Sequence, residues 1–110
     1  MLSSDIDLQH KQIIDAVLIG APGVKQGKLF GYTAYKINGR AFAVWCGGGL
    51  AIKLPGETVQ SLIAAGRAGP FEPVEGTLWR EWALLSLTSP ADASAAAPLL
   101  DEAMAFTVSS

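Results

Sequence analysis

An Asn-Gly pair, Asn38-Gly39, is the feature that most constrains how this chain can fold. It stands between two runs of β-prone residues. A two-residue hairpin turn of type I′ needs positive φ at both central positions, and Asn followed by Gly adopts that conformation at low cost. The pair therefore predicts a β-hairpin with strands at about 29–37 and 40–46.

Three consecutive glycines, Gly47-Gly48-Gly49, follow the second of these strands. They lack the Gly-Lys-Ser/Thr ending of a phosphate-binding loop and do not lead into a helix, so they favour a hairpin turn over a phosphate cradle. A third strand is expected at about 50–54, which makes the segment an antiparallel meander.

The two turns also predict a register, and the register predicts two faces. A two-residue loop pairs Ile37 with Arg40, and a three-residue loop pairs Cys46 with Leu50. The expected core face holds Tyr35, Phe42, Val44, Cys46, Leu50, Ile52 and Leu54. The expected opposite face holds Tyr32, Lys36, Trp45 and Lys53 among Ala34, Ala41, Ala43 and Ala51.

Helical spacing of apolar residues predicts three helices, at about 5–18, 57–65 and 98–107. The segment 77–87 is predicted to be a strand, although the spacing of Trp79 and Trp82 also suits one face of a helix. The segment 89–97 is alanine-rich and only weakly specified. We expect an α+β fold in one domain over 1–110: an antiparallel β-meander of about four to five strands, packed with an N-terminal, a middle and a C-terminal helix.

Charge is distributed unevenly along the chain. Between Ala16 and Gly56 there are five basic residues and no acidic residue, while the rest has three basic and ten acidic residues, so the two parts carry +5 and −7. The overall charge of −2 argues against a general attraction to nucleic acid. It leaves room for a local basic face.

The predicted binding residues are the cations of this acid-free segment and the two aromatic residues expected beside them. They are Lys25, Lys28, Tyr32, Lys36, Arg40, Trp45 and Lys53. Aromatic rings stack on unpaired bases while lysines neutralise phosphates, so this combination suits single-stranded nucleic acid. Two alternatives stay open: the lysines are ordinary solvated residues that discourage edge pairing, or the face is covered by a helix or a second subunit.

Candidate chemistry is sparse. The single cysteine, Cys46, is expected to be structural, because a buried apolar thiol has a raised pKa. The single histidine, His10, is expected to make a surface contact with Asp7, one helical turn away. The sequence predicts no metal site, no cofactor and no catalytic set. The acidic start and the short apolar runs predict neither a secretory signal nor a membrane span, which favours a cytoplasmic protein.

Several short motifs occur in a recognisable order. They are Gly27-Lys28-Leu29-Phe30-Gly31, Gly39-Arg40-Ala41-Phe42-Ala43, Leu50-Ala51-Ile52-Lys53-Leu54, Gly69-Pro70-Phe71-Glu72-Pro73 and the pair Trp79 and Trp82. From about Pro22 to Phe106 the chain resembles the TfoX N-terminal domain and the related MmcQ/YjbR-like proteins of bacteria. The resemblance implies a small α+β domain with a curved antiparallel sheet, and a regulatory or DNA-associated role without defined catalytic residues. The second, helical domain of TfoX is not seen in this chain, and the usual methionine at Leu29 is replaced.

The sequence therefore predicts a non-enzymatic binding module, regulatory or nucleic-acid-associated. One alternative is a protein–protein module or homodimer that buries Tyr32 and Trp45. Another is a small-molecule-binding protein or enzyme with a pocket lined by Phe71, Trp79 and Trp82.

Overall fold

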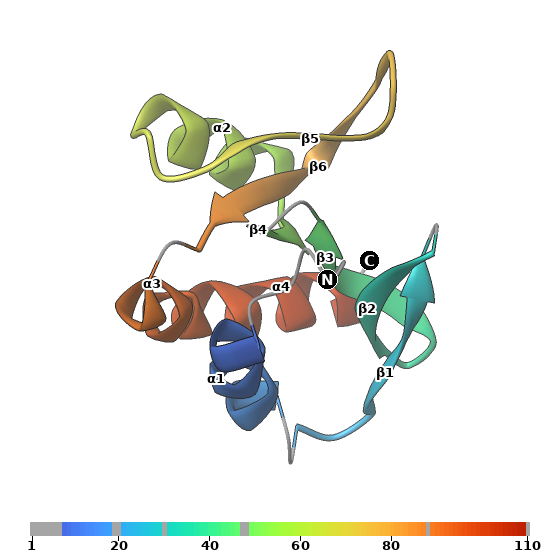
Figure 1. Cartoon of the computed structure of the whole chain (residues 1–110). Helices are drawn as coiled ribbons and strands as arrows, with labels where there is room; N and C mark the ends of the chain where they lie inside the picture. The colour runs from blue at the N-terminus through green and yellow to red at the C-terminus, as the bar shows by residue number, and fades with distance from the viewer. Residues whose placement is uncertain (1–7, 19–20, 30, 47–48, 88, 110) are drawn as a thin grey trace.

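The structure is a computed structural model that describes residues 8–18, 21–29, 31–46, 49–87 and 89–109 (Figure 1). It is an α+β fold, as expected, built on one open antiparallel sheet. The strands are β1 Val24–Leu29, β2 Tyr32–Ile37, β3 Arg40–Cys46, β4 Gly49–Lys53, β5 Gly69–Val74 and β6 Thr77–Ser86. The helices are α1 Leu8–Leu18, α2 Gly56–Ala64, α3 Pro90–Ala95 and α4 Ala97–Ser109.

The sheet has six strands in the order β1-β2-β3-β4-β6-β5, where four to five were expected. The strands β2, β3 and β4 form the predicted meander, β1 extends it at one edge, and β6 pairs with β4 while β5 lies at the other edge. One extra strand is β1, which lies almost wholly before the expected strand 29–37 and is separated from β2 at Gly31, which has φ of +82°. The other is β5, which contains prolines at positions 70 and 73; proline is disfavoured inside a sheet but tolerated at its edge.

Helices were predicted well except for α3. The N-terminal, middle and C-terminal helices are confirmed as α1, α2 and α4. The additional helix α3 is capped by Ser89, whose hydroxyl accepts a hydrogen bond from the Asp92 N–H at 3.2 Å, and Pro90 is its first residue. Ser-Pro-Ala-Asp is a usable N-terminal signal that the alanine-rich composition obscured.

Two apolar clusters lie on opposite faces of the sheet. The first is the helix face, where Ile14, Val59, Ala93 and Leu100 from the four helices pack against strand residues including Leu50 and Ile52. The second is the strand face, which consists of Ala34, Val44, Ala51, Phe71 and Trp82 with Leu29, Ala41, Cys46, Trp79 and Leu84 around them. Every member of this second cluster belongs to a strand, whereas α4 runs across the helix face against β2, β3 and β4 (Figure 1).

The Asn-Gly turn has the predicted geometry. Asn38 and Gly39 have φ of 51° and 82°, and Ile37 pairs with Arg40. One residue later the ladder departs from the prediction, because Lys36 pairs with Ala41 but Tyr35 pairs with Ala43. The extra residue between them is Phe42, which forms a β-bulge and changes which residues of β3 face inward.

The connection from β3 to β4 is also one residue shorter than predicted. Gly49 belongs to β4 and pairs with Cys46, and Leu50 pairs with Trp45 instead of Cys46. The conformation of Gly47 and Gly48 lies outside the described residues. The expected pairing of Cys46 with Leu50 is therefore wrong.

These two departures exchange the faces of four residues in β3. Ala43 and Trp45 belong to the helix face, and Val44 and Cys46 belong to the strand face. The remaining members of the expected core face are buried on the helix side as predicted: Tyr35, Phe42, Leu50, Ile52 and Leu54. Side chains alternate along a strand, so a slip of one residue turns each of them to the other face.

Candidate functional site

Three of the five predicted cations share the strand face. Lys25 and Lys36 are directly paired across β1 and β2, and Lys36 pairs with Ala41, which packs against the strand cluster. Lys53 pairs with Trp82, a member of that cluster. Because cross-strand partners point to the same side of a sheet, Lys25, Lys36 and Lys53 all project from the strand face.

The three lysines form a row across the strands. Lys25 and Lys36 are neighbours on adjacent strands. Lys53 follows Ile52, which pairs with Ala43, so Lys53 lies opposite the β-bulge of β3. Strands are spaced by about 4.8 Å, so the Cα atoms of Lys36 and Lys53, two strands apart, are separated by about 10 Å. The stem of Lys36 lies over Gly27, which has no side chain to displace it, and its Cε comes within 3.5 Å of where a Cβ would be.

The other two predicted cations do not join this row. Lys28 pairs with Thr33 and Arg40 pairs with Ile37, which places both on the helix side of the sheet. Tyr32, two residues before Ala34 along β2, is on the strand face and is 37% exposed. The structure thus brings together four of the seven predicted residues: Lys25, Tyr32, Lys36 and Lys53.

Trp45 is not a surface residue, which corrects the prediction. Its side chain is 2% exposed and packs in the helix-face cluster. The indole Nε1–H donates to the Tyr35 hydroxyl oxygen at 3.0 Å, so its polar atom is satisfied inside the protein. The expected pairing of Trp45 with Tyr32 on an exposed face is therefore wrong, and its physical cause is the bulge at Phe42.

A polar chain anchors α1 to the sheet around Trp45. The Tyr35 hydroxyl donates to Asp15 Oδ1 at 2.5 Å, and Asp15 Oδ2 accepts from Lys11 Nζ at 2.8 Å. Lys11 also donates to the side-chain oxygen of Gln26 on β1 at 3.2 Å. Burial, together with the hydrogen bond to Asp15, raises the pKa of Tyr35 well above its ordinary value. These hydrogen bonds keep the Tyr35 phenol in its neutral form and connect α1 to β1, β2 and β3, so their role is structural.

The strand face also carries an aromatic cluster that the sequence did not assign to it. Phe71, Trp79 and Trp82 are in mutual contact, with ring centroids 5.7 to 5.9 Å apart. Phe71 and Trp82 are buried, and Trp79 is half-buried. The three rings fill each other's space, so they form a packed cluster at the β5–β6 end of the lysine row. The pairing of β4 with β6 places these rings beside the lysine row, and the spacing of the residues along the sequence does not predict that position.

The remaining candidates for chemistry have different surroundings from those predicted. His10 is 6% exposed and therefore buried, not a surface residue, and Asp7 lies outside the described residues. Cys46 is half-buried on the strand face and not on the expected core face. Within the described residues no group of three or more His, Cys, Asp or Glu side chains could hold a metal ion. No helix in the described part of the chain is long and apolar enough to cross a membrane.

Comparison with known proteins adds no further constraint on the site. No family model, no curated protein and no solved structure matches the chain.

Proposed function

We propose that this protein is a non-enzymatic binding module whose strand face binds single-stranded nucleic acid. The observation that carries the proposal is the row formed by Lys25, Lys36 and Lys53 on one face of the sheet. In the described part of the chain, no acidic side chain forms an ion pair with any of the three. A row of unneutralised cations attracts a phosphate backbone.

The flanking rings suit the same ligand. Tyr32 lies in the sheet half that carries Lys25 and Lys36, and Trp79 lies at the far end beyond Lys53. Both rings retain accessible surface, while Phe71 and Trp82 beneath Trp79 are buried and support it. Bases stack on such rings without regard to sequence, so we expect weak preference among short oligonucleotides. This role accords with the resemblance to the TfoX N-terminal domain, which itself stays a prediction.

The proposal is tested by fluorescence anisotropy with a labelled oligothymidylate and the corresponding duplex. Contacts to about three phosphates predict that log K falls with log salt concentration with a slope of about −2 for the single strand. Lys36→Gln should weaken binding and reduce the slope by about 0.7. Lys28→Gln is the matched control, because it removes the same charge from the other side of the sheet and should change neither.

Several results would overturn the proposal. Absence of binding at about 50 mM salt would do so, as would binding without a salt slope. Equal effects of Lys36→Gln and Lys28→Gln would show that only the total charge matters. Preference for the duplex would remove the stacking role of Tyr32 and Trp79.

A homodimer through the strand face is the second candidate, favoured by the exposed ring of Tyr32. An isologous dimer places the same surface on both partners, so the lysine rows would approach each other unless acidic residues intervened. Trp45 cannot take part in such an interface because it is buried. A sizing measurement on the wild type and on Tyr32→Glu tests it: a dimer that Tyr32→Glu dissociates supports this candidate, and a monomer in both excludes it.

A further inference from the structure

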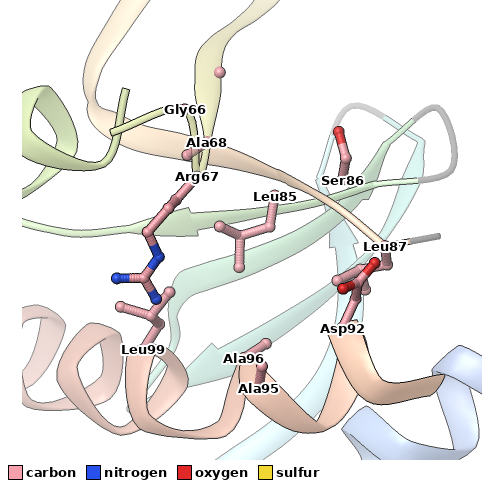
Figure 2. Close-up of a pocket in the computed structure, with 11 residues that line it drawn as sticks. Gly66, Arg67, Ala68, Leu85, Ser86, Leu87, Asp92, Ala95, Ala96 and Leu99 are labelled. Atoms are coloured by element: carbon pink, nitrogen blue, oxygen red, sulfur yellow. The ribbon is translucent and has the colours of Figure 1, made fainter. Parts of the chain in front are cut away.

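A pocket lies away from the strand face, between the end of α2, the end of β6 and the two C-terminal helices (Figure 2). Its volume is about 520 Å³, within the range of small-molecule sites in proteins. None of the seven predicted binding residues lines it, and neither do Phe71, Trp79 or Trp82. It is therefore independent of the proposed nucleic-acid face.

The pocket has a mixed lining, and its apolar part comes from β6 and the two C-terminal helices. Leu85 projects into it from β6, and Leu99 lines it from the first turn of α4 (Figure 2). Ala95 ends α3, and Ala96 lies between α3 and α4. Leu85 and Ala96 are buried members of the helix-face cluster, so these walls are held by the core. An apolar wall of this kind contributes affinity through the burial of an apolar ligand body.

Charged groups stand at two ends of the pocket. Arg67 follows α2, and its guanidinium extends alongside Leu99, while Asp92 of α3 and Ser86 of β6 lie on the far side of Leu85 (Figure 2). The backbone of Arg67 is fixed by a hydrogen bond from its N–H to the Leu62 carbonyl at 2.9 Å, and that of Asp92 by the Ser89 cap. Both charges therefore stand on anchored backbone and face a common apolar space.

We propose that this pocket binds a small molecule with a carboxylate at one end, an apolar body and an ammonium group at the other end. The guanidinium of Arg67 presents a planar fork that matches a carboxylate with two parallel hydrogen bonds. The apolar body packs on Leu85 and Leu99, and the ammonium group donates to the Asp92 carboxylate. The opposite charges of the two ends set the orientation of the ligand.

Three related probes test the proposal by titration, followed through the amide resonances of the protein. The first is 4-(aminomethyl)benzoate, which has both charged groups on an aromatic body. The second is 4-methylbenzoate, which lacks the ammonium group, and the third is benzylamine, which lacks the carboxylate. We expect 4-(aminomethyl)benzoate to shift the amides of residues 67–69, 86–87, 92–97 and 99. It should bind at least about tenfold more tightly than either of the others, because each of those loses one charge-assisted hydrogen bond.

Two arginine variants distinguish binding in the pocket from a general effect of the protein's charge on affinity. Arg67→Gln should weaken binding of 4-(aminomethyl)benzoate by about tenfold or more. Arg80→Gln removes an exposed arginine that does not line the pocket and should leave the affinity unchanged. Absence of shifts at the pocket up to about 10 mM probe, equal affinity for the three probes, or equal effects of the two variants would overturn the proposal.

Discussion

The helix face and the strand face of the sheet are both buried at their centres, but different groups bury them. On the helix face, four helices cover the strands, and a polar chain through Tyr35 satisfies the buried tryptophan. On the strand face, the cluster consists of strand residues alone, and its largest members are the rings at the β5–β6 end. The two faces also differ in how their lysines are paired. Lys11 on the helix face forms an ion pair with Asp15, whereas the lysine row on the strand face has no acidic partner among the described residues.

This difference teaches which face is available for binding. Covering a sheet with helices and satisfying its polar groups stabilises the fold and leaves no extended strand surface for a nucleic acid to contact. Cations held without a partner contribute little to stability and keep their attraction for an anion. We therefore attribute most of the stability to the helix face and keep the strand face as the proposed site for nucleic acid, and the following substitutions test that division.

The largest effect is expected for Trp45→Ala. It removes a fully packed ring from the helix face and the donor of the bond to Tyr35, and should lower the free energy of unfolding by about 3–5 kcal/mol. Tyr32→Ala, on the strand face, should cost less than about 1 kcal/mol because that ring is partly exposed. Urea denaturation followed by circular dichroism measures both, and similar losses for the two variants would contradict the assignment.

Two glycines on the strand face provide a second contrast. A Cβ at Gly49 would lie 2.6 Å from the backbone oxygen of Leu85, so Gly49→Ala should destabilise the protein by about 3 kcal/mol. A Cβ at Gly27 would meet only the Lys36 side chain, at 3.5 Å, and alanine restricts the unfolded chain more than glycine. Gly27→Ala should therefore be neutral or stabilise by up to about 1 kcal/mol. Thermal unfolding of both variants checks the pair, and a large loss for Gly27→Ala would show that the edge of this face is packed as tightly as its centre.

Much of the fold was predictable because it depends on local chemistry. The Asn38-Gly39 turn, the helix before Gly66 and the strand that contains Trp82 all follow from spacing and turn residues. Which residues of β3 face the helices was not predictable. A single bulged residue, Phe42, reverses the alternation of the side chains that follow it, and nothing in the local sequence marks the bulge.

The candidate site shows the same limit. Lys36 and Lys53 were placed on one face correctly, because the bulge in β3 and the shorter connection from β3 to β4 cancel each other in β4. Trp45 was misplaced because it follows the bulge. The approach of Arg67 and Asp92 to one pocket depends on how α2 and α3 pack on the sheet, which no short-range pattern encodes.

Tyr35→Phe is expected to cost less at neutral pH than Trp45→Ala or Gly49→Ala, and it has the most specific pH dependence. Loss of the hydroxyl removes one bond from Trp45 and one to Asp15 and should cost about 1–2 kcal/mol. Burial raises the folded-state pKa of Tyr35 above its ordinary value of 10.0. Its contribution is therefore fully present below pH 10 and decreases as pH rises toward the folded-state pKa, because the unfolded chain releases the proton first. The difference in unfolding free energy between the wild type and Tyr35→Phe should shrink above pH 10, by up to about 1.4 kcal/mol per pH unit. Tyr32→Phe is the matched control on the strand face. If the difference in unfolding free energy between the wild type and Tyr32→Phe shrinks equally above pH 10, the pH dependence does not come from the buried hydroxyl of Tyr35, and the prediction is wrong.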